Sequence, residues 1–455
     1  MLALALLAAI PLHFHYDASE FTNAVYHVTC LTTRVPCTNS VFNEFWDHEL
    51  HLSAADQRQL DAWLEIFRKV ENAAPAPPGA PLLPNYLSFY PSLKARHRIV
   101  AAAVEAHSAD DFRRRAAKFL DPTDASRLSR VLQHFELRLH PWWVAKGHRF
   151  VAVHTRQVQQ QMRTSGLMPL AGQVSAFLEA NLPKKDVYIH AIPGPIPTSK
   201  DASATVLANH FFVEILASDK PEDTTWKAMH ELTHAFYDSA PAARHQALMT
   251  QFVAAGVQPA FYTFLNEAVA TAVQLLVYEK EGITDNDPYH HPYIPRLGRS
   301  TLPLLKEALA KHGSLFEGFT EGYLRAAAAE LKEESSSPRF VLAAAGVLAS
   351  EKNHSAFDMF FERIQPSFYL TTEKEWLLFP GLNGVRLLTY DELPPFASKI
   401  PNLESLIQSG SFAYASARTG KGTEFILAGR DADALVAAVK RLAKLPSVPA
   451  QGLIF

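Results

Sequence analysis

Residues 230–234 read His-Glu-Leu-Thr-His and lie within a helical pattern that we expect to run from Thr225 to Asp238. In a helix, residues four apart lie one above the other on the same face, so both imidazoles can reach a single metal ion. The glutamate between them projects from nearly the same side and can reach a water on that ion. Zinc binds nitrogen and carboxylate ligands, so the pattern predicts a zinc-binding helix. The alternative is an exposed helix whose His and Glu side chains are merely solvated.

A catalytic zinc site needs a third protein ligand. The arrangement in which a glycine and a histidine follow at fixed steps is excluded, because Tyr237 and Ala240 occupy those positions. The best candidate is Glu267, in a long apolar segment, residues 259–279, that we expect to be helical. A lone carboxylate in such a segment is costly to bury without a partner, and zinc would be that partner. The alternative is that Glu267 lies on a narrow solvent-facing stripe or pairs with an arginine.

The His-Glu-Leu-Thr-His motif, together with Asn-Glu-Ala-Val-Ala at 266–270, resembles the gluzincins, the metallopeptidase clan that includes thermolysin and related aminopeptidases. The resemblance covers roughly residues 185–280. It implies a thermolysin-like catalytic core, in which a strand, matched here by residues 204–216, forms the edge along which the substrate lies. Two departures leave the subfamily open. Thr271 stands where thermolysin-like enzymes have an aspartate that holds a zinc histidine, and the aminopeptidases' G-x-M-E-N motif is absent.

The same resemblance implies a role for each motif residue. His230, His234 and Glu267 would hold Zn²⁺, and Glu231 would be the general base. Zinc lowers the pKa of the water that it binds towards neutrality. Glu231 would take the proton as the water attacks a carbonyl and would pass it to the leaving amine. The implied substrate is a peptide or protein.

The oxyanion that develops during such a reaction needs a hydrogen-bond donor besides the metal. Residues 287–293, Asp-Pro-Tyr-His-His-Pro-Tyr, are the richest local supply, and Tyr293 and His291 are our candidates. The alternative is a rigid, proline-bounded surface loop. Asp238, four residues after His234, could orient a zinc-binding histidine. It could equally lie on the surface at the end of its helix.

The patterns along the chain predict an α+β protein that is mainly helical, with a small β-sheet before the metal-binding helix. Residues 302–364 have helical patterns, and the last stretch alternates strands with one amphipathic helix. His190 and His210, on two predicted strands, are expected to be packed side chains rather than ligands. The expected divisions are a signal peptide at 1–16, a helical region at 17–150, a metallopeptidase domain with a helical C-terminal part at 151–384, and a small α/β domain at 385–455.

The beginning of the chain predicts export. Residues 1–12 form an apolar run that is too short to cross a bilayer as a helix but fits the core of a secretory signal peptide. The alternative is a buried first helix. Cys30 and Cys37 are the only cysteines, and they either close a small disulfide loop in an oxidising compartment or remain as thiols. We therefore expect a secreted or periplasmic protein without stable membrane insertion.

The net charge of –3 over 455 residues is close to neutral, so the sequence makes no electrostatic case for a nucleic-acid partner. The leading hypothesis for function is a zinc-dependent peptidase. One alternative is a zinc hydrolase that acts on a non-protein amide, such as cell-wall material. A second alternative is a non-catalytic binding protein with a vestigial metal site, although a structural site has no need for Glu231. The natural substrate, the cleavage preference and the oligomeric state are not predicted.

Overall fold

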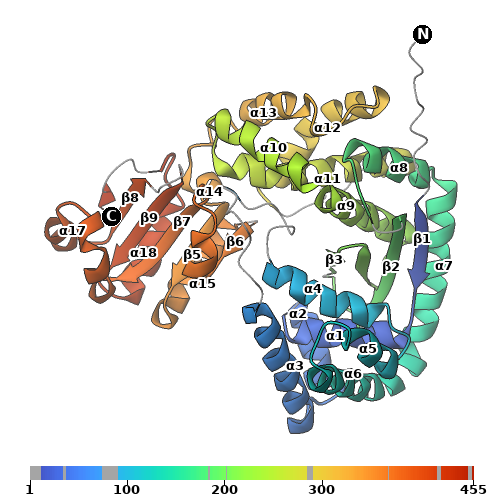
Figure 1. The fold of residues 1–455 in the computed structure, drawn as a ribbon. Coiled ribbons are helices and arrows are strands. Elements are labelled where there is room, and N and C mark those ends of the chain that lie inside the picture. The colour runs from blue at the N-terminus through green and yellow to red at the C-terminus, as the bar shows by residue number, and fades with distance from the viewer. Residues whose placement is uncertain are drawn as a thin grey trace.

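The fold is α+β and mainly helical, with two mixed β-sheets that lie in different parts of the chain (Figure 1). Residues 1–11, which are most of the predicted signal peptide, lie outside the described residues. The computed structural model describes residues 12–33, 37–73, 83, 91–182, 185–200, 202–283, 291–366, 368–417, 422–448 and 453–454.

The N-terminal helices pack around a core rich in aromatic side chains, including Trp46, Trp63 and Phe135. The predicted boundary at residue 150 does not separate two units, because a helix runs through it. Helix α6 continues through a π-helical turn, η1, directly into α7. The helices are α1 (Glu20–Leu31), α2 (Asn39–His48), α3 (Ala54–Ala73), α4 (Pro91–Val104), α5 (Ala109–Ala116), α6 (Pro122–Trp142), η1 (Trp143–Gly147), α7 (His148–Thr164) and α8 (Leu167–Phe177).

A disulfide bond joins Cys30, near the end of α1, to Cys37, just before α2. The sequence left this pairing open, and the structure shows it. Next to the disulfide, the backbone N–H of Thr38 donates to the carboxylate of Glu214 at 3.0 Å. Tyr26 of α1 donates its hydroxyl to the same carboxylate at 2.7 Å. Residues on both sides of the disulfide are therefore hydrogen-bonded to a buried strand of the first sheet.

The first sheet has the strand order β1-β2-β4-β3. Strands β1, β2 and β4 are parallel, and β3 pairs antiparallel with β4. The segment 204–216, expected as one strand, is instead a hairpin with a turn at Ala208, whose φ is 55°, and Asn209. Strand β3 is consequently the edge of the sheet. The strands are β1 (His13–Asp17), β2 (Asp186–Pro193), β3 (Ala204–Leu207) and β4 (His210–Ile215).

Residues 13–16, predicted to belong to the signal peptide, form most of β1 and pair with β2 in register, with Phe14 opposite Val187. Both faces of the sheet are covered. Phe211 and Val213 of β4 pack with the helices that follow the sheet, while Phe212 packs with the N-terminal helices. This double burial explains why residues 211–213 of β4 are consecutive apolar residues rather than an alternation of apolar and polar ones. The sheet thus separates two hydrophobic cores.

The helices after the sheet surround α11, which contacts both α9 and α12. Gly298 of α12 lies so close to Thr271 of α11 that a Cβ there would be 2.3 Å from the Thr271 methyl group. Among the described residues, only α11 is long and apolar enough to cross a membrane, but 78% of its apolar window is buried in the protein. These helices are α9 (Pro221–Ser239), α10 (Ala242–Ala254), α11 (Pro259–Glu281), α12 (Ile294–Ala310), α13 (Phe319–Glu330) and α14 (Pro338–Val341).

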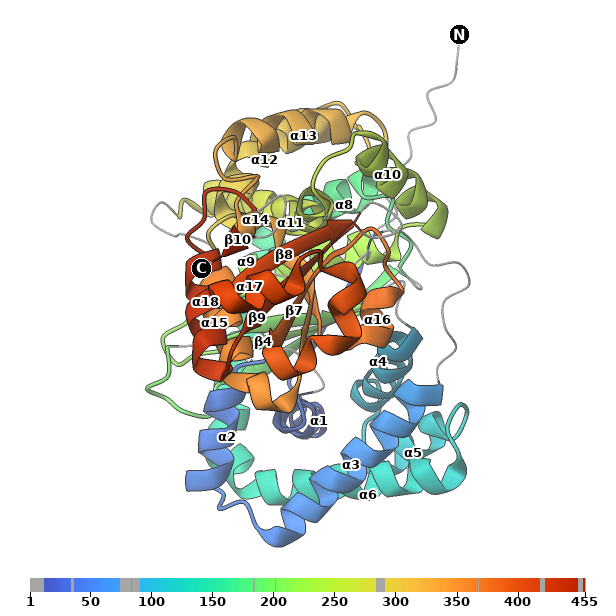
Figure 2. The same ribbon diagram turned by 90° about the vertical axis from the view of Figure 1, so that its left-hand side faces the viewer.

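The second sheet has the order β10-β8-β9-β7-β5-β6 and lies to one side of the helices (Figures 1 and 2). The predicted strands near 385–429 and the final amphipathic helix are present, but the sheet begins at Ala344 rather than at 385. The expectation of helix throughout 302–364 is wrong for β5, because a short buried apolar run has no distinguishing period. The strands at 412–417 and 423–429 pair antiparallel.

This C-terminal unit has mostly short elements. Its strands are β5 (Ala344–Ala349), β6 (Phe368–Leu370), β7 (Asn383–Thr389), β8 (Phe412–Ala417), β9 (Thr423–Gly429) and β10 (Leu453–Ile454). Its helices are η3 (Glu351–Asn353), α15 (His354–Ile364), α16 (Glu373–Leu377), η4 (Tyr390–Glu392), η5 (Pro394–Lys399), α17 (Leu403–Ser409) and α18 (Ala432–Leu442).

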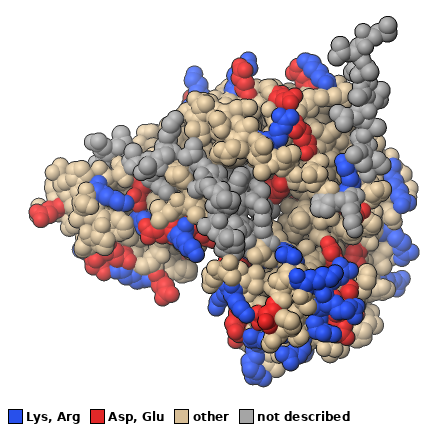
Figure 3. Space-filling view, viewed as in Figure 1, with Lys and Arg blue, Asp and Glu red and all other residues tan. Residues whose placement is uncertain are grey.

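Charged side chains of both signs are interspersed over most of the face shown in Figure 3. Many of them form ion pairs at the surface, such as Arg127 with Glu65 at 2.7 Å and Arg115 with Asp111 at 3.1 Å. Exposed pairs of this kind contribute little to stability, typically about 0–1 kcal/mol each. The charges that bear on function lie in the interior.

Candidate metal centre

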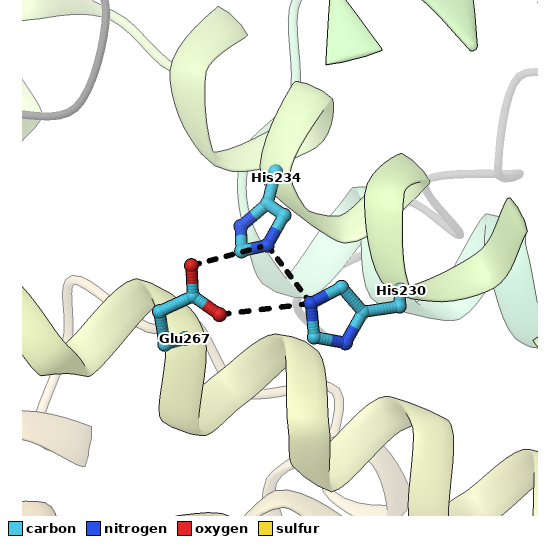
Figure 4. A group of neighbouring side chains, drawn as sticks. All are labelled: His230, His234 and Glu267. Atoms are coloured by element: carbon cyan, nitrogen blue, oxygen red, sulfur yellow. Dashed lines mark hydrogen bonds and ion pairs between the residues drawn. The ribbon is translucent and has the colours of Figure 1, made fainter. Parts of the chain in front are cut away.

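Two helices bring three candidate ligands to one point (Figure 4). His230 and His234 lie one turn apart on α9, and Glu267 faces them from α11. The two imidazole Nε2 atoms are 3.0 Å apart. The Glu267 carboxylate oxygens lie 3.6 Å from Nε2 of His230 and 3.7 Å from Nε2 of His234. One possible ligand atom from each residue falls within 4.8 Å of the others, and among the described residues this is the only such group.

The sequence accounts locally for the position of α9. Pro221 occupies the first turn, where a missing N–H is harmless, and the backbone N–H of Lys220 donates to the Asp223 carboxylate at 2.9 Å. The helix then continues for five turns without a breaker. His230 and His234 are 5% and 3% exposed, so the metal-facing side of α9 is turned into the protein.

Gln274 determines which nitrogen of His230 faces the cluster. Its side-chain oxygen lies 3.0 Å from His230 Nδ1, while its amide nitrogen donates to the Tyr278 hydroxyl at 2.7 Å. An amide oxygen can only accept, so Nδ1 of His230 carries the proton. Nε2 therefore presents a lone pair toward His234 and Glu267. This is the tautomer that binds a metal through Nε2.

The residues present fit a zinc ion. Two imidazole nitrogens and one carboxylate are a known ligand set for catalytic zinc, which leaves a position open. Burial raises the pKa of Glu267, but the imidazoles of His234 and His230, when they are protonated, outweigh it and lower the pKa to about 2. A cation bound between the three side chains would take over this role and leave both imidazoles neutral. The carboxylate is consequently ionised at neutral pH. Oxygen and nitrogen lone pairs that converge in a buried site are stabilised by a cation between them.

Glu231 lies beside the ligands, on the wall of a pocket of about 230 Å³. Burial raises the pKa of its carboxyl group to about 7, with Glu267 adding to the shift and His234 opposing it. A cation bound by the neighbouring ligands would lower this pKa, because it stabilises the ionised form. Edge strand β3 contributes to the same pocket. The pocket is lined by Ala202, Ser203, Ala204, Trp226, Lys227, His230, Glu231 and Gln274.

The two residues predicted to stabilise the oxyanion are not among those that line the pocket. Tyr293 is buried, and its ring packs edge-on against Phe340 at 5.2 Å. Nδ1 of His291 accepts from the backbone N–H of Tyr293 at 3.2 Å, and Nε2 donates to the carbonyl of Gln365 at 3.1 Å. His291 thus caps the beginning of α12. His291 is in reach of the Tyr293 backbone N–H because α12 begins at Ile294, only three residues further along the chain.

Three other residues that the sequence analysis singled out are His190, His210 and Asp238. His190 and His210 are buried, and their facing nitrogens lie 3.0 Å apart. His190 also bonds to Asp17 of β1 at 3.0 Å. These two histidines are packed on the first sheet, as expected, and do not join the metal centre. Asp238 lies in the last turn of α9.

The role of Gln274 as the hydrogen-bond partner of His230 was not predicted, although its position in the sequence indicates it. It lies seven residues after Glu267, which is two helical turns and therefore the same face of α11. Thr271, the position at which an aspartate was expected from the resemblance, is instead buried against Gly298. The signal in the sequence was therefore Gln274, the polar side chain that lies two turns after Glu267 on the same face of α11.

Comparison of the chain with models of protein families, with curated proteins and with solved structures finds no match. The interpretation of the site consequently rests on the geometry and chemistry of its own residues.

Proposed function

We propose that the chain is a zinc-dependent peptidase of the gluzincin type with a thermolysin-like catalytic core. His230, His234 and Glu267 would hold the zinc, and Glu231 would be the general base. The observation that carries the proposal is the convergence of the three ligands beside an additional carboxylate in a pocket bounded by an edge strand. A purely structural metal site would need neither that carboxylate nor that strand.

Zinc in this position supplies Lewis acidity and makes water more acidic. Glu231 takes a proton from the attacking water and returns it to the leaving amine. Its position on the pocket wall places it next to the ligands and next to any substrate in the pocket. Gln274 keeps His230 in the required tautomer by accepting a hydrogen bond from its Nδ1–H group.

Strand β3 provides a way to hold a peptide. It pairs with β4 on one side and is the edge of its sheet, so one row of its backbone groups is directed away from the sheet. An extended substrate can add to such an edge through main-chain hydrogen bonds. Ala204, the first residue of β3, lines the pocket that contains Glu231. A peptide on this edge would therefore pass the general base.

The disulfide supports a secreted or periplasmic location for this activity. Disulfide bonds persist in oxidising compartments and are rare in the reducing cytosol. The bond between Cys30 and Cys37 holds the segment that hydrogen-bonds Glu214. A zinc peptidase that is exported to an oxidising compartment would account for both the disulfide and the candidate metal-binding residues.

The decisive test combines metal analysis with peptide hydrolysis. The purified wild-type chain should hold about one zinc per molecule, and His230→Ala should lose it. Glu231→Gln should keep the zinc but reduce hydrolysis by on the order of 10²–10⁴-fold, because the general base is removed. Normal hydrolysis by Glu231→Gln would contradict the mechanism. Cleavage of cell-wall fragments, with no peptide cleaved, would change the substrate class and leave the metal centre intact.

A further inference from the structure

The pocket beside the metal centre has a cationic side chain on its wall. Lys227 precedes Glu231 by four residues on α9, so the two side chains lie on the same face, about one 5.4 Å turn apart. Both line the same pocket of about 230 Å³. A substrate whose scissile bond lies at Glu231 would place a neighbouring group next to Lys227.

Lys227 is held in place on both sides. Its ammonium lies 3.0 Å from the Asp219 carboxylate, and its side chain is only 13% exposed. Asp219 is itself fixed by the backbone N–H of Leu216 at 3.1 Å. The ammonium also lies 5.6 Å from the centre of the Trp226 ring, within range of a cation–π contact. Asp219 uses one of the three N–H donors of the ammonium, so further donors are available to a ligand.

Trp226 lines the same pocket. Its indole Nε1 is buried and has no hydrogen-bond acceptor within the part of the chain that the structure describes. The ring is held by an edge-on contact with Tyr278 at 5.7 Å between centroids. A buried N–H without an acceptor costs about 1–3 kcal/mol, so an acceptor from a ligand would be favoured. Two neighbouring donors, one of them charged, match an anionic acceptor.

We propose that this pocket binds a carboxylate of the substrate through Lys227 and Trp226, so that cleavage occurs next to a carboxylate-bearing residue. The inference rests on the proposed peptidase function and names its substrate class. A singly charged group fits better than a phosphate, because Asp219 already offsets part of the Lys227 charge. In a peptide the carboxylate comes from an acidic side chain or from the C-terminus, and the two sources share this chemistry.

The test compares kcat/KM for matched peptides. One pair differs only in Glu or Gln beside the cleaved bond, and a second pair differs only in a free or amidated C-terminus. The wild type should favour the carboxylate member of one pair by on the order of tenfold to a hundredfold. The first pair identifies an acidic side chain as the source, and the second identifies the terminal carboxylate.

Variants then assign the preference to the pocket. Lys227→Met keeps the aliphatic stem and should bring the ratio close to one, while Lys227→Arg should retain most of it. Trp226→Phe, which removes the N–H donor together with part of the ring, should reduce the ratio in part. Lys306→Met is the matched control, because Lys306 pairs with Glu279 on the surface of α12 and α11. It should leave the ratio unchanged.

A second measurement separates this inference from the catalytic proposal. Zinc-loaded Glu231→Gln should bind the carboxylate peptide more tightly than its partner, and the added Lys227→Met change should abolish the difference. A wild type that cleaves both members of each pair equally, or a preference that persists in Lys227→Met, would overturn the inference while leaving the peptidase standing. A zinc-loaded wild type that cleaves no peptide would instead overturn the proposed function.

Discussion

Two buried clusters of charged side chains, one beside each sheet, are assembled in opposite ways. In the C-terminal sheet, Arg386 donates to Glu424 at 2.6 Å, and Lys399 donates to the same carboxylate at 3.0 Å. Cation and anion alternate there, so each charge has an opposite neighbour. In the metal centre, two imidazole nitrogens 3.0 Å apart and a carboxylate converge on one point.

The difference shows how to interpret a buried polar cluster. Burial raises the pKa of Glu424, but Arg386 and Lys399 outweigh it and hold the pKa below its ordinary value. The Arg386 guanidinium also lies 4.8 Å from the centre of the Phe396 ring. This cluster contains its own counter-ions and is therefore complete without a ligand. The metal centre has a surplus of lone pairs, and a cation is what would complete it.

The largest effect on stability is expected when the buried ion pair between Arg386 and Glu424 is broken. Glu424→Gln should lower the free energy of unfolding by about 3–5 kcal/mol, because it leaves the Arg386 charge buried with one partner fewer. Urea denaturation measures the change, and zinc content should stay the same. A double variant, Arg386→Leu with Glu424→Leu, should recover much of the loss. Glu307→Gln, in an exposed pair with Lys311, is the control and should leave the denaturation midpoint unchanged.

The next largest effect on stability is expected when zinc binds between His230, His234 and Glu267. Zinc that binds only the folded protein stabilises it by about 2.7 kcal/mol at a free concentration of 100 times its Kd. Hydrogen exchange should slow in α9 and α11, which carry the ligands, while exchange in β7 and β9 should change only through global unfolding. Zinc-dependent protection of the C-terminal sheet, without protection of α9, would contradict the assignment of the site.

The smallest effect tests the residue that orients the metal centre. Gln274→Leu should weaken zinc affinity by about 10–100-fold, because His230 loses the acceptor that fixes its tautomer. Gln274→Glu should retain the affinity, since a carboxylate oxygen accepts the same hydrogen bond from His230 Nδ1–H. Competition with a zinc chelator measures both values. Thr271→Val is the matched control on α11 and should have no effect, which would show that Gln274, rather than the residue at the thermolysin aspartate position, has this role.

Local patterns were the reliable part of sequence reasoning. The position of His230 and His234 on one face of α9 follows from their spacing, because four residues are close to one turn of an α-helix. The position of Glu267 on a buried helix follows from its apolar neighbours, because a carboxylate in such a segment needs a partner. What a local pattern does not contain is a partner that is distant in the sequence. The ring nitrogens of His291, whose catalytic role stays a prediction, bond to the start of α12 and to Gln365. His291 also lies close enough to Glu267 to lower the pKa of that carboxyl group.

The hairpin of β3 and β4 and the early start of the second sheet show the same limit. In both regions a buried apolar run gave no period from which its partner could be identified. A turn at Ala208 converts one expected strand into an edge strand and its neighbour. The pocket exists because that edge lies against α9, which in turn packs against α11, and no local pattern contains these contacts.

By itself, the sequence identified the residues of the candidate metal centre, since their chemical types depend on residue identity and helical spacing. These residues are His230, His234, Glu267 and the adjacent Glu231. Tertiary structure decided the rest. It selected Gln274 as the partner of His230 and placed Lys227 in the pocket beside Glu231. The physical reason is that spacing along one helix fixes which side chains share a face. Only the packing of helix against helix and strand decides what that face meets.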